Sequence, residues 1–157
     1  QTANGTDGCE KIWQIRREFS YALRDTGLTK LNEDVVVPRG RLGDLFKFAQ
    51  QLQKKHGLPL ACFGHAGDGN IHVNIMAANY HEDPRVHAAV DRALDELFTQ
   101  VLAWGGVITG EHGIGREKRD YIALAIDPPT LDLMRRIKAQ FDPKGILNPD
   151  KIFPPAT

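Results

Sequence analysis

The sequence predicts an α+β domain in which helices pack on a mainly antiparallel sheet. Segments with apolar residues at helical spacing alternate with short segments whose pattern is typical of strands. Two of these strands flank Asp68-Gly69, a turn signal of a tight antiparallel hairpin. The length of 157 residues matches one ordinary domain with a hydrophobic core of its own. A hairpin within this alternation favours a layered α+β domain over a doubly wound parallel sheet.

The first segment predicts a helix followed by a strand. Asp7 can cap the helix, because Glu10 follows it at the spacing of a capping box. An apolar stripe continues from there, and Gly27 ends the helix. Residues 30–37 then predict a strand, which Pro38 closes because proline cannot donate a ladder hydrogen bond.

The middle of the chain predicts two longer helices around the hairpin. A second apolar stripe indicates a helix that begins near Leu42 and ends at Gly57. The hairpin follows over residues 60–76. Asp83 and Pro84 are typical of an N-cap and a first helical position. The long helix that they open should extend to Gly105.

The last third predicts a short strand and two further helices. Residues 107–109 are expected to form the strand, which leads into a glycine-rich turn. A helix is expected near residues 118–125. Asp127 and Pro128 open the last helix, which ends at Asp142.

Composition and charge narrow the class of protein. Hydrophobic residues make up 41% of the chain and charged residues 25%, as in a soluble globular domain. The net charge is zero, which argues against nucleic acid as the main partner. No apolar run approaches the roughly 20 residues of a transmembrane segment, and no signal peptide is recognised. Cys9 and Cys62 fit no metal or redox spacing, so we expect reduced thiols and a cytoplasmic location.

The hairpin carries two histidines that could bind one metal ion. If Asp68-Gly69 is a two-residue loop, His65 lies directly opposite His72. Cβ atoms of such partners are about 4.5–5.5 Å apart, which allows both imidazoles to reach one ion. Asn74 shares the strand face of His72 and can offer its amide to a ligand. The alternative is a polar hairpin with two histidines at a solvent edge.

A glycine-rich turn places Glu111 and His112 after the short strand. Glu111 would complete a set of two histidines and one glutamate with open coordination positions, as in catalytic metal sites. Neighbouring residues of a regular strand point to opposite faces, so Glu111 and His112 can serve one pocket only where the backbone bends. Gly110 and Gly113 permit that bend. The alternative is a surface turn with a solvated glutamate and histidine.

Three motifs together resemble the C-terminal domain of FAD-linked oxidases. They are Gly-His-Ala-Gly-Asp-Gly-Asn-Ile-His, Gly-Glu-His-Gly-Ile-Gly and the tail Phe-Asp-Pro-Lys-Gly-Ile-Leu-Asn-Pro-Asp-Lys. The resemblance extends from about Trp13 to Phe153. It covers glycolate oxidase flavin subunits, D-lactate dehydrogenases and D-2-hydroxyglutarate dehydrogenases. It implies a ferredoxin-like substrate domain, with a flavin-binding domain before it in the whole protein.

The resemblance also assigns roles to particular residues. It implies that His65, His72 and Glu111 bind a divalent metal (zinc, manganese or iron), the same set that the spacing suggests. It implies His112 as the catalytic base. It implies substrate contacts by four side chains: Arg16, Ser20, Lys30 and Asn74. Arg16 and Ser20 are four residues apart on the first helix, so both can face one carboxylate. The flavin-contacting residues are not identified.

These inferences predict that residues 1–157 are the C-terminal substrate- and metal-binding domain of an FAD-dependent D-2-hydroxy-acid dehydrogenase. The expected partners are a small 2-hydroxy acid, the protein's own flavin domain and an electron-acceptor subunit. The expected location is cytoplasmic, either free or peripheral to a membrane, and the domain alone should be inactive for lack of flavin. Two alternatives are a metal-dependent hydrolase that uses the same ligands and a non-enzymatic metal-binding interaction module.

Overall fold

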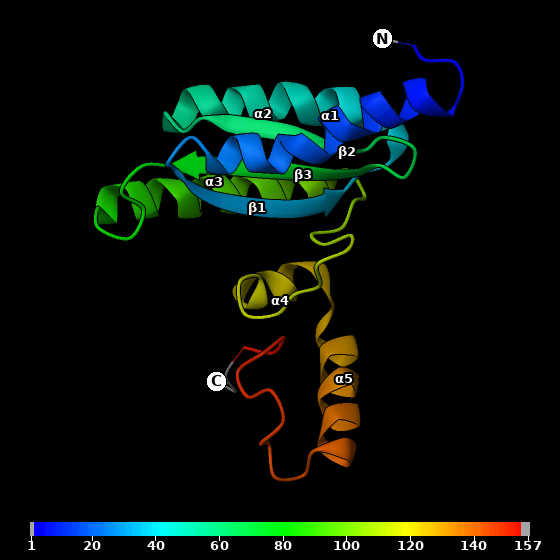
Figure 1. Ribbon diagram of the computed structural model, residues 1–157. Helices are drawn as coiled ribbons and strands as arrows, with labels where there is room; N and C mark the ends of the chain where they lie inside the picture. The colour runs from blue at the N-terminus through cyan, green and yellow to red at the C-terminus, as the bar shows by residue number, and fades with distance from the viewer. Residues whose placement is uncertain (1, 155–157) are drawn as a thin grey trace.

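A three-stranded antiparallel sheet with the order β1-β3-β2 forms the centre of the computed structural model, which describes residues 2–154 (Figure 1). Strand β3 lies in the middle and pairs with both neighbours. The strands and longer helices are, in chain order, α1 (Thr6–Arg24), β1 (Thr29–Val36), α2 (Leu42–His56), β2 (Leu60–His65), β3 (Asn70–Ala77), α3 (Pro84–Ala103), α4 (Ile122–Ala125) and α5 (Pro128–Phe141). One-turn 3₁₀ helices lie at Arg39–Arg41 and Arg119–Tyr121.

The two faces of the sheet have different roles because side chains alternate along each strand. On one face, apolar residues of β1 and β3 pack under α2 and α3 and form the core, with Val35, Val73, Ile75, Leu45, Leu97 and Phe98 almost fully buried. The opposite face is polar and carries Asn32, Asp34, His72 and Asn74. Helix α1 lies over that polar face, where Phe19 meets Phe63 edge-to-face at 5.9 Å (Figure 1).

The α+β class is confirmed. The order β1-α2-β2-β3-α3 follows the ferredoxin-like pattern, and the position of a fourth strand beside β1 is occupied by Val107. The strand expected over residues 107–109 is wrong, because only an isolated bridge between Val36 and Val107 forms. After Val107 the backbone turns toward Asp34. The Asp34 carboxylate accepts hydrogen bonds from the N–H groups of Gly110, Glu111 and His112, which therefore do not pair with a neighbouring strand.

The predicted register of the hairpin is wrong by two residues. His65 pairs with Asn70, and the partner of His72 is Phe63, so the loop has four residues rather than two. A turn bond from the Asp68 N–H to the His65 carbonyl closes this loop. The carbonyl of Gly69 accepts a hydrogen bond from Val37 at the end of β1, and a Cβ at Gly69 would lie 2.1 Å from the Val37 oxygen. Tertiary contact with β1 therefore selects the longer loop.

Most helix ends lie where local signals place them. Asp83 and Asp127 each accept a backbone N–H at a helix start, and Gly57 ends α2 in the left-handed conformation. The Asp7 cap is wrong, because α1 begins at Thr6 with Gly5 at the N-cap and Asp7 lies inside the first turn. The helix near residues 118–125 is divided into a 3₁₀ turn and α4, a difference of one turn.

The C-terminal part stands apart from the sheet (Figure 1). Helix α5 and the tail are tied together by Asp142, which accepts the N–H groups of Ile146 and Leu147 and pairs with Lys138. Several large apolar side chains of this part are exposed, namely Leu124, Leu133, Ile137, Phe141, Ile146, Leu147 and Ile152. Within residues 2–154, no helix is long and apolar enough to cross a membrane.

Candidate metal centre

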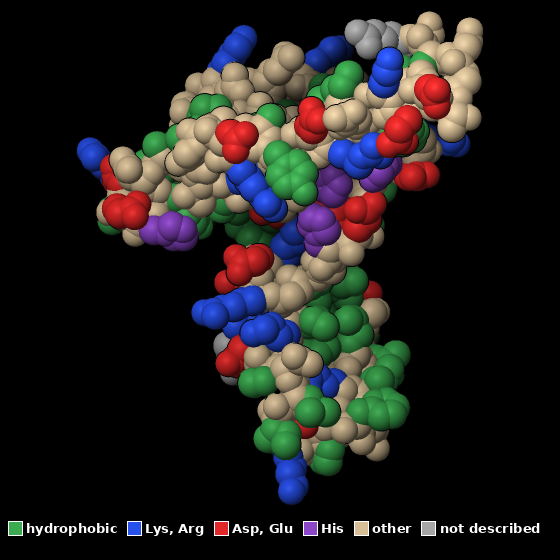
Figure 2. Space-filling model, in the orientation of Figure 1, with side chains coloured by type: hydrophobic (Ala, Val, Ile, Leu, Met, Phe, Trp, Pro, Cys, Tyr) green, Lys and Arg blue, Asp and Glu red, His purple; other side chains and the backbone are tan. Residues whose placement is uncertain are grey.

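The polar face of the sheet brings together the two hairpin histidines and Glu111. The Nε2 atom of His65 lies 3.6 Å from one Glu111 carboxylate oxygen, and Nε2 of His72 lies 3.9 Å from the other. All three ligand atoms are within 4.8 Å of one another. The register error does not separate the histidines, because a shift of two residues leaves every side chain on its own face. Figure 2 shows histidine and acidic side chains gathered here.

This donor set fits a divalent ion. Imidazole nitrogen and carboxylate oxygen suit zinc, manganese and iron, and three protein ligands leave coordination positions for a substrate. Glu111 and His65 are exposed, whereas His72 is buried. The Nδ1 atom of His72 is buried without a hydrogen-bond partner, so one polar atom of this ring is unsatisfied. Burial lowers the pKa of His72, opposed by the Asp34 carboxylate, and a neutral ring is the form that binds metal.

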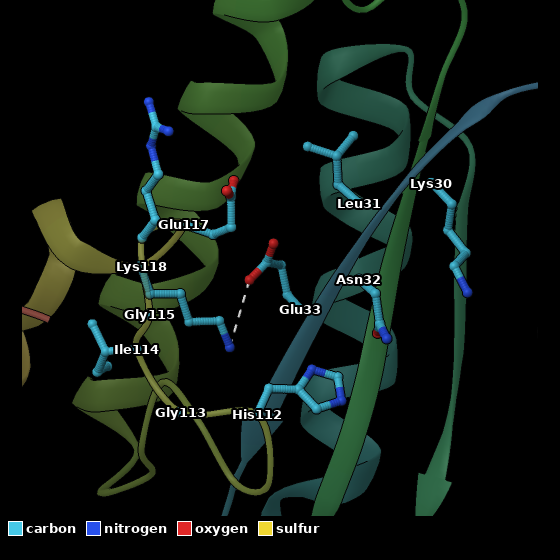
Figure 3. Close-up of a pocket in the computed structure, with 11 residues that line it drawn as sticks. Lys30, Leu31, Asn32, Glu33, His112, Gly113, Ile114, Gly115, Glu117 and Lys118 are labelled. Atoms are coloured by element: carbon cyan, nitrogen blue, oxygen red, sulfur yellow. Dashed lines mark ion pairs between the residues drawn. The ribbon is translucent and has the colours of Figure 1, made fainter. Parts of the chain in front are cut away.

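His112 lies beside the cluster, as the bend at the glycine-rich turn predicts. Its ring stacks on His72 with the centroids 5.3 Å apart and an interplanar angle of 28°. Gly113 has a φ of +72°, and this left-handed residue turns the chain so that Glu111 and His112 both reach the polar face. The His112 side chain is exposed and points from the turn toward β1 (Figure 3). It can therefore exchange a proton with a bound molecule.

Asp34 organises the glycine-rich turn, and the sequence reasoning missed it. Its Oδ2 accepts the N–H groups of Gly110, Glu111 and His112 at 2.9, 2.6 and 2.8 Å, together with the Thr109 hydroxyl at 3.3 Å. Burial by itself would raise the pKa of this carboxyl, but the three N–H bonds outweigh it and hold the pKa at about 2. The sequence signal that could have revealed it is an aspartate directly before three valines in a predicted strand, because such a strand is buried and a buried carboxylate needs partners. The structure indeed buries Asp34 completely.

The substrate residues expected on the strands lie on the same face. The Asn74 amide donates to the backbone oxygens of Ala61 and His72, which leaves its Oδ1 buried and unpartnered. Asn32 is the cross-strand partner of Asn74, and its Oδ1 is unpartnered too. In the part of the chain that the structure describes, every buried side-chain nitrogen or oxygen atom without a hydrogen-bond partner belongs to this face of β1 and β3. Such clustering is typical of a ligand site.

The substrate residues expected on α1 face the same side of the sheet. The Cζ atom of Arg16 lies 5.3 Å from the centre of the Phe63 ring, and that ring lies 5.8 Å from His72. The ammonium group of Lys30 donates to the Ser20 hydroxyl at 2.8 Å. Burial, and next the charge of Arg24, lower the pKa of Lys30. All of the predicted site residues therefore belong to α1, the polar face of the sheet or the glycine-rich turn, on one side of the sheet.

A cavity of about 390 Å³ adjoins His112 at the free edge of β1. Figure 3 shows Glu33 and Lys118 pointing toward each other across it, and their charged groups are 3.6 Å apart. Lys118 also donates to the backbone oxygens of Asp34 and Ile108. Burial lowers the pKa of Lys118 and raises that of Glu33, so each charge depends on the other. Lys118 thereby links β1 to the chain segments on either side of the glycine-rich turn.

The fold and this site define a domain of a known family. The chain matches the family described as FAD linked oxidases, C-terminal domain, over residues 1–152, and it belongs to that family. Among curated relatives, it is 35% identical to glycolate oxidase subunit GlcD of Bacillus subtilis over 98% of the chain and 32% of that protein. It is 37% identical to a D-lactate dehydrogenase of Anaerostipes hadrus, over 89% of the chain and 29% of that protein.

A D-2-hydroxyglutarate dehydrogenase of Stutzerimonas stutzeri is 31% identical over 92% of the chain and 31% of its own length. The chain thus spans about a third of the length of the curated relatives that it matches. The resemblance inferred from the three motifs is confirmed at the level of the family.

Proposed function

We propose that this chain is the substrate- and metal-binding domain of an FAD-dependent dehydrogenase that oxidises a D-2-hydroxy acid to the 2-oxo acid. The observation that supports the proposal most is the grouping on one polar face of His65, His72 and Glu111, with His112 stacked beside them. The names of the relatives, which concern glycolate, D-lactate and D-2-hydroxyglutarate, agree with this substrate class. The site residues inferred from the sequence stay part of the proposal.

In this proposal, the chain's own side chains bind and orient the substrate and remove one proton. His65, His72 and Glu111 hold a divalent ion, which would supply a Lewis acid next to the substrate hydroxyl. Arg16 holds the substrate carboxylate through paired hydrogen bonds, and Ser20 and Lys30 extend this anion site. Asn74 offers its unpartnered Oδ1 to a hydroxyl donor. An imidazole nitrogen of His112 accepts the hydroxyl proton as general base.

FAD would supply the two-electron acceptor that this oxidation needs, while His112 takes the hydroxyl proton. We infer that the flavin is held mainly by a separate domain of the whole protein. The exposed apolar side chains of α5 and the tail, visible in Figure 2, agree with a further domain packing there. The electron-acceptor subunit and the cytoplasmic location, free or at a membrane surface, stay predictions.

Metal content tests the proposed centre. The purified chain should carry close to one equivalent of zinc, manganese or iron, measured by elemental analysis without chelators. His65→Ala and His72→Ala should each lose it, because each removes one of three protein ligands. His87→Ala is the matched control, since His87 is exposed on α3 and pairs with Asp91 away from the site. Metal retained in both ligand variants would contradict the centre.

Turnover in the full-length, flavin-containing protein separates this function from the two alternatives. His112→Ala should keep the metal and reduce turnover of the hydroxy acid by about 100-fold or more, the usual contribution of a general base. Unchanged turnover would refute the role of His112. A hydrolase would release product without reducing a flavin, and an interaction module would show no turnover with any 2-hydroxy acid.

A further inference from the structure

Asn32 lies in the middle of β1, where an asparagine contributes little to the strand itself. Asparagine is disfavoured in strands, because its side chain competes for backbone hydrogen bonds. The side chain of Asn32 is half-buried, and its Oδ1 is buried without a hydrogen-bond partner. Its cross-strand partner Asn74 differs, because the Asn74 amide donates to two backbone oxygens. The fold gains no hydrogen bond from the Asn32 oxygen, which is typical of a residue that serves a ligand.

Asn32 is surrounded by residues of the proposed site. Lys30 precedes it by two positions, and both side chains project from the same side of β1 (Figure 3). Asn74 lies directly across the ladder. Asn32 and His112 both line the cavity of about 390 Å³ at the edge of β1. A substrate in contact with His112 can therefore reach Asn32 with a part that extends along β1.

The proposed contacts leave one direction open for the rest of the substrate. The α-carbon of a 2-hydroxy acid carries a hydroxyl, a carboxylate, a hydrogen and one further substituent. The metal ligands lie toward the hairpin loop, two or more residues beyond Asn74 along the sheet. Arg16, the proposed ligand of the carboxylate, lies over the Phe63 ring on β2. The further substituent is left with the opposite direction, along β1 away from the loop, where Asn32 and Lys30 lie.

This end of the site is polar. The ammonium group of Lys30 donates to the Ser20 hydroxyl, and Asn32 has an amide that can both donate and accept. The last torsion of an asparagine side chain is broad, so the amide can turn its oxygen or its N–H toward the cavity. An alkyl substituent would cover these polar groups without giving them a partner, whereas a hydroxyl would satisfy one of them.

We propose that Asn32 is a specificity-determining residue that selects 2-hydroxy acids whose further substituent bears oxygen over those with an alkyl substituent. The inference rests on the proposed function for the reaction and for the position of the α-carbon. A site that hydrogen-bonds a substituent discriminates against an analogue without that group, because the analogue leaves the protein's own polar group unpaired.

Two matched substrates test this selection in the full-length, flavin-containing protein. D-Glycerate and D-2-hydroxybutyrate have nearly the same shape, with a hydroxyl in the first where the second has a methyl group. The value of kcat/KM should be higher for D-glycerate by about 10-fold, the effect of one hydrogen bond and of the unpaired group left without it. Asn32→Val should bring this ratio to about 1, because valine offers no hydrogen bond. Asn32→Thr has the shape of valine but keeps a hydroxyl, so it should retain a preference for D-glycerate.

Thermal unfolding of the same two variants separates selection from a role in the fold. Both should unfold at or above the midpoint of the unsubstituted chain, because β-branched residues favour strands and the amide oxygen that they replace has no partner. A lower midpoint in both variants would assign the amide to the fold and overturn the proposal.

The kinetic outcomes are distinct. An unsubstituted protein that oxidises D-2-hydroxybutyrate as well as D-glycerate overturns the selection, even if the variants fail to fold, and leaves the proposed function in place. A preference for D-glycerate that is unchanged in folded Asn32→Val overturns the role of Asn32. Oxidation of no 2-hydroxy acid refutes the proposed function, and the inference falls with it.

Discussion

Acid should destabilise the folded chain through Asp34, and Asp34→Asn should remove this part of the pH dependence. Burial would raise the pKa of the Asp34 carboxyl, but the N–H bonds from His112, Glu111 and Gly110 hold it at about 2, against 3.8 for an ordinary aspartate. The folded-state pKa therefore lies below the unfolded one. The stability from this group is complete above the unfolded pKa and is lost as the pH falls through the folded pKa.

The pKa difference sets the size of the effect. A shift from 3.8 to about 2 corresponds to about 2 kcal/mol of unfolding free energy near neutral pH. About 1 kcal/mol of this should disappear between about pH 5 and about pH 3, and the rest at lower pH. Because Asp34→Asn has no carboxyl at this position, it should be less stable by about 2 kcal/mol near neutral pH, and this gap should halve at about pH 3.

Urea unfolding followed by circular dichroism measures this gap at each pH. A chelator in the buffer removes any contribution of bound metal, and m-values confirm that the same surface is exposed in both proteins. Asp120→Asn controls for the loss of one carboxyl, because Asp120 is exposed and pairs with its neighbour Arg119. A gap between the unsubstituted chain and Asp34→Asn that stays constant from about pH 7 to about pH 3 would refute the reasoning.

Two further predictions concern the supports of the site. Gly64→Ala should destabilise the hairpin by about 3 kcal/mol, because the new Cβ would lie 2.3 Å from the Asn70 carbonyl oxygen. Gly67→Ala meets nothing within 4 Å and is the control in thermal unfolding; equal midpoints would contradict the register described. Lys118→Met should cost about 3 kcal/mol because it leaves the Glu33 carboxyl buried without its cation, and adding Glu33→Leu should recover part of that loss in urea unfolding. No recovery in the double variant would refute the pairing.

Local sequence patterns are sufficient to predict most helix ends and the strand face on which the histidines lie. Gly57 and Asp83 mark helix ends because their effects depend on the residues beside them. His65 and His72 share a face in the predicted register and in the observed one, since a two-residue shift does not change the alternation of a strand. The donor set of the candidate centre was therefore predictable, although the register that positions it was not.

The sequence motifs also reach the family, and the matched relatives confirm that result. They reach it because the residues around a metal or substrate site tolerate little change in type or spacing, so they recur as short ordered motifs. Pairing between distant segments leaves no such local trace.

Only the tertiary structure decided the contacts that position the ligands. Asp34 is 76 to 78 positions away from the N–H groups that it accepts, and Glu33 is held by Lys118 from a different part of the chain. Val37 selects the hairpin loop through a bond to Gly69 that neither segment signals alone. A buried charge or a free backbone group is satisfied by whichever partner the folded chain brings near, and that choice depends on the packing of the whole domain rather than on neighbouring residues.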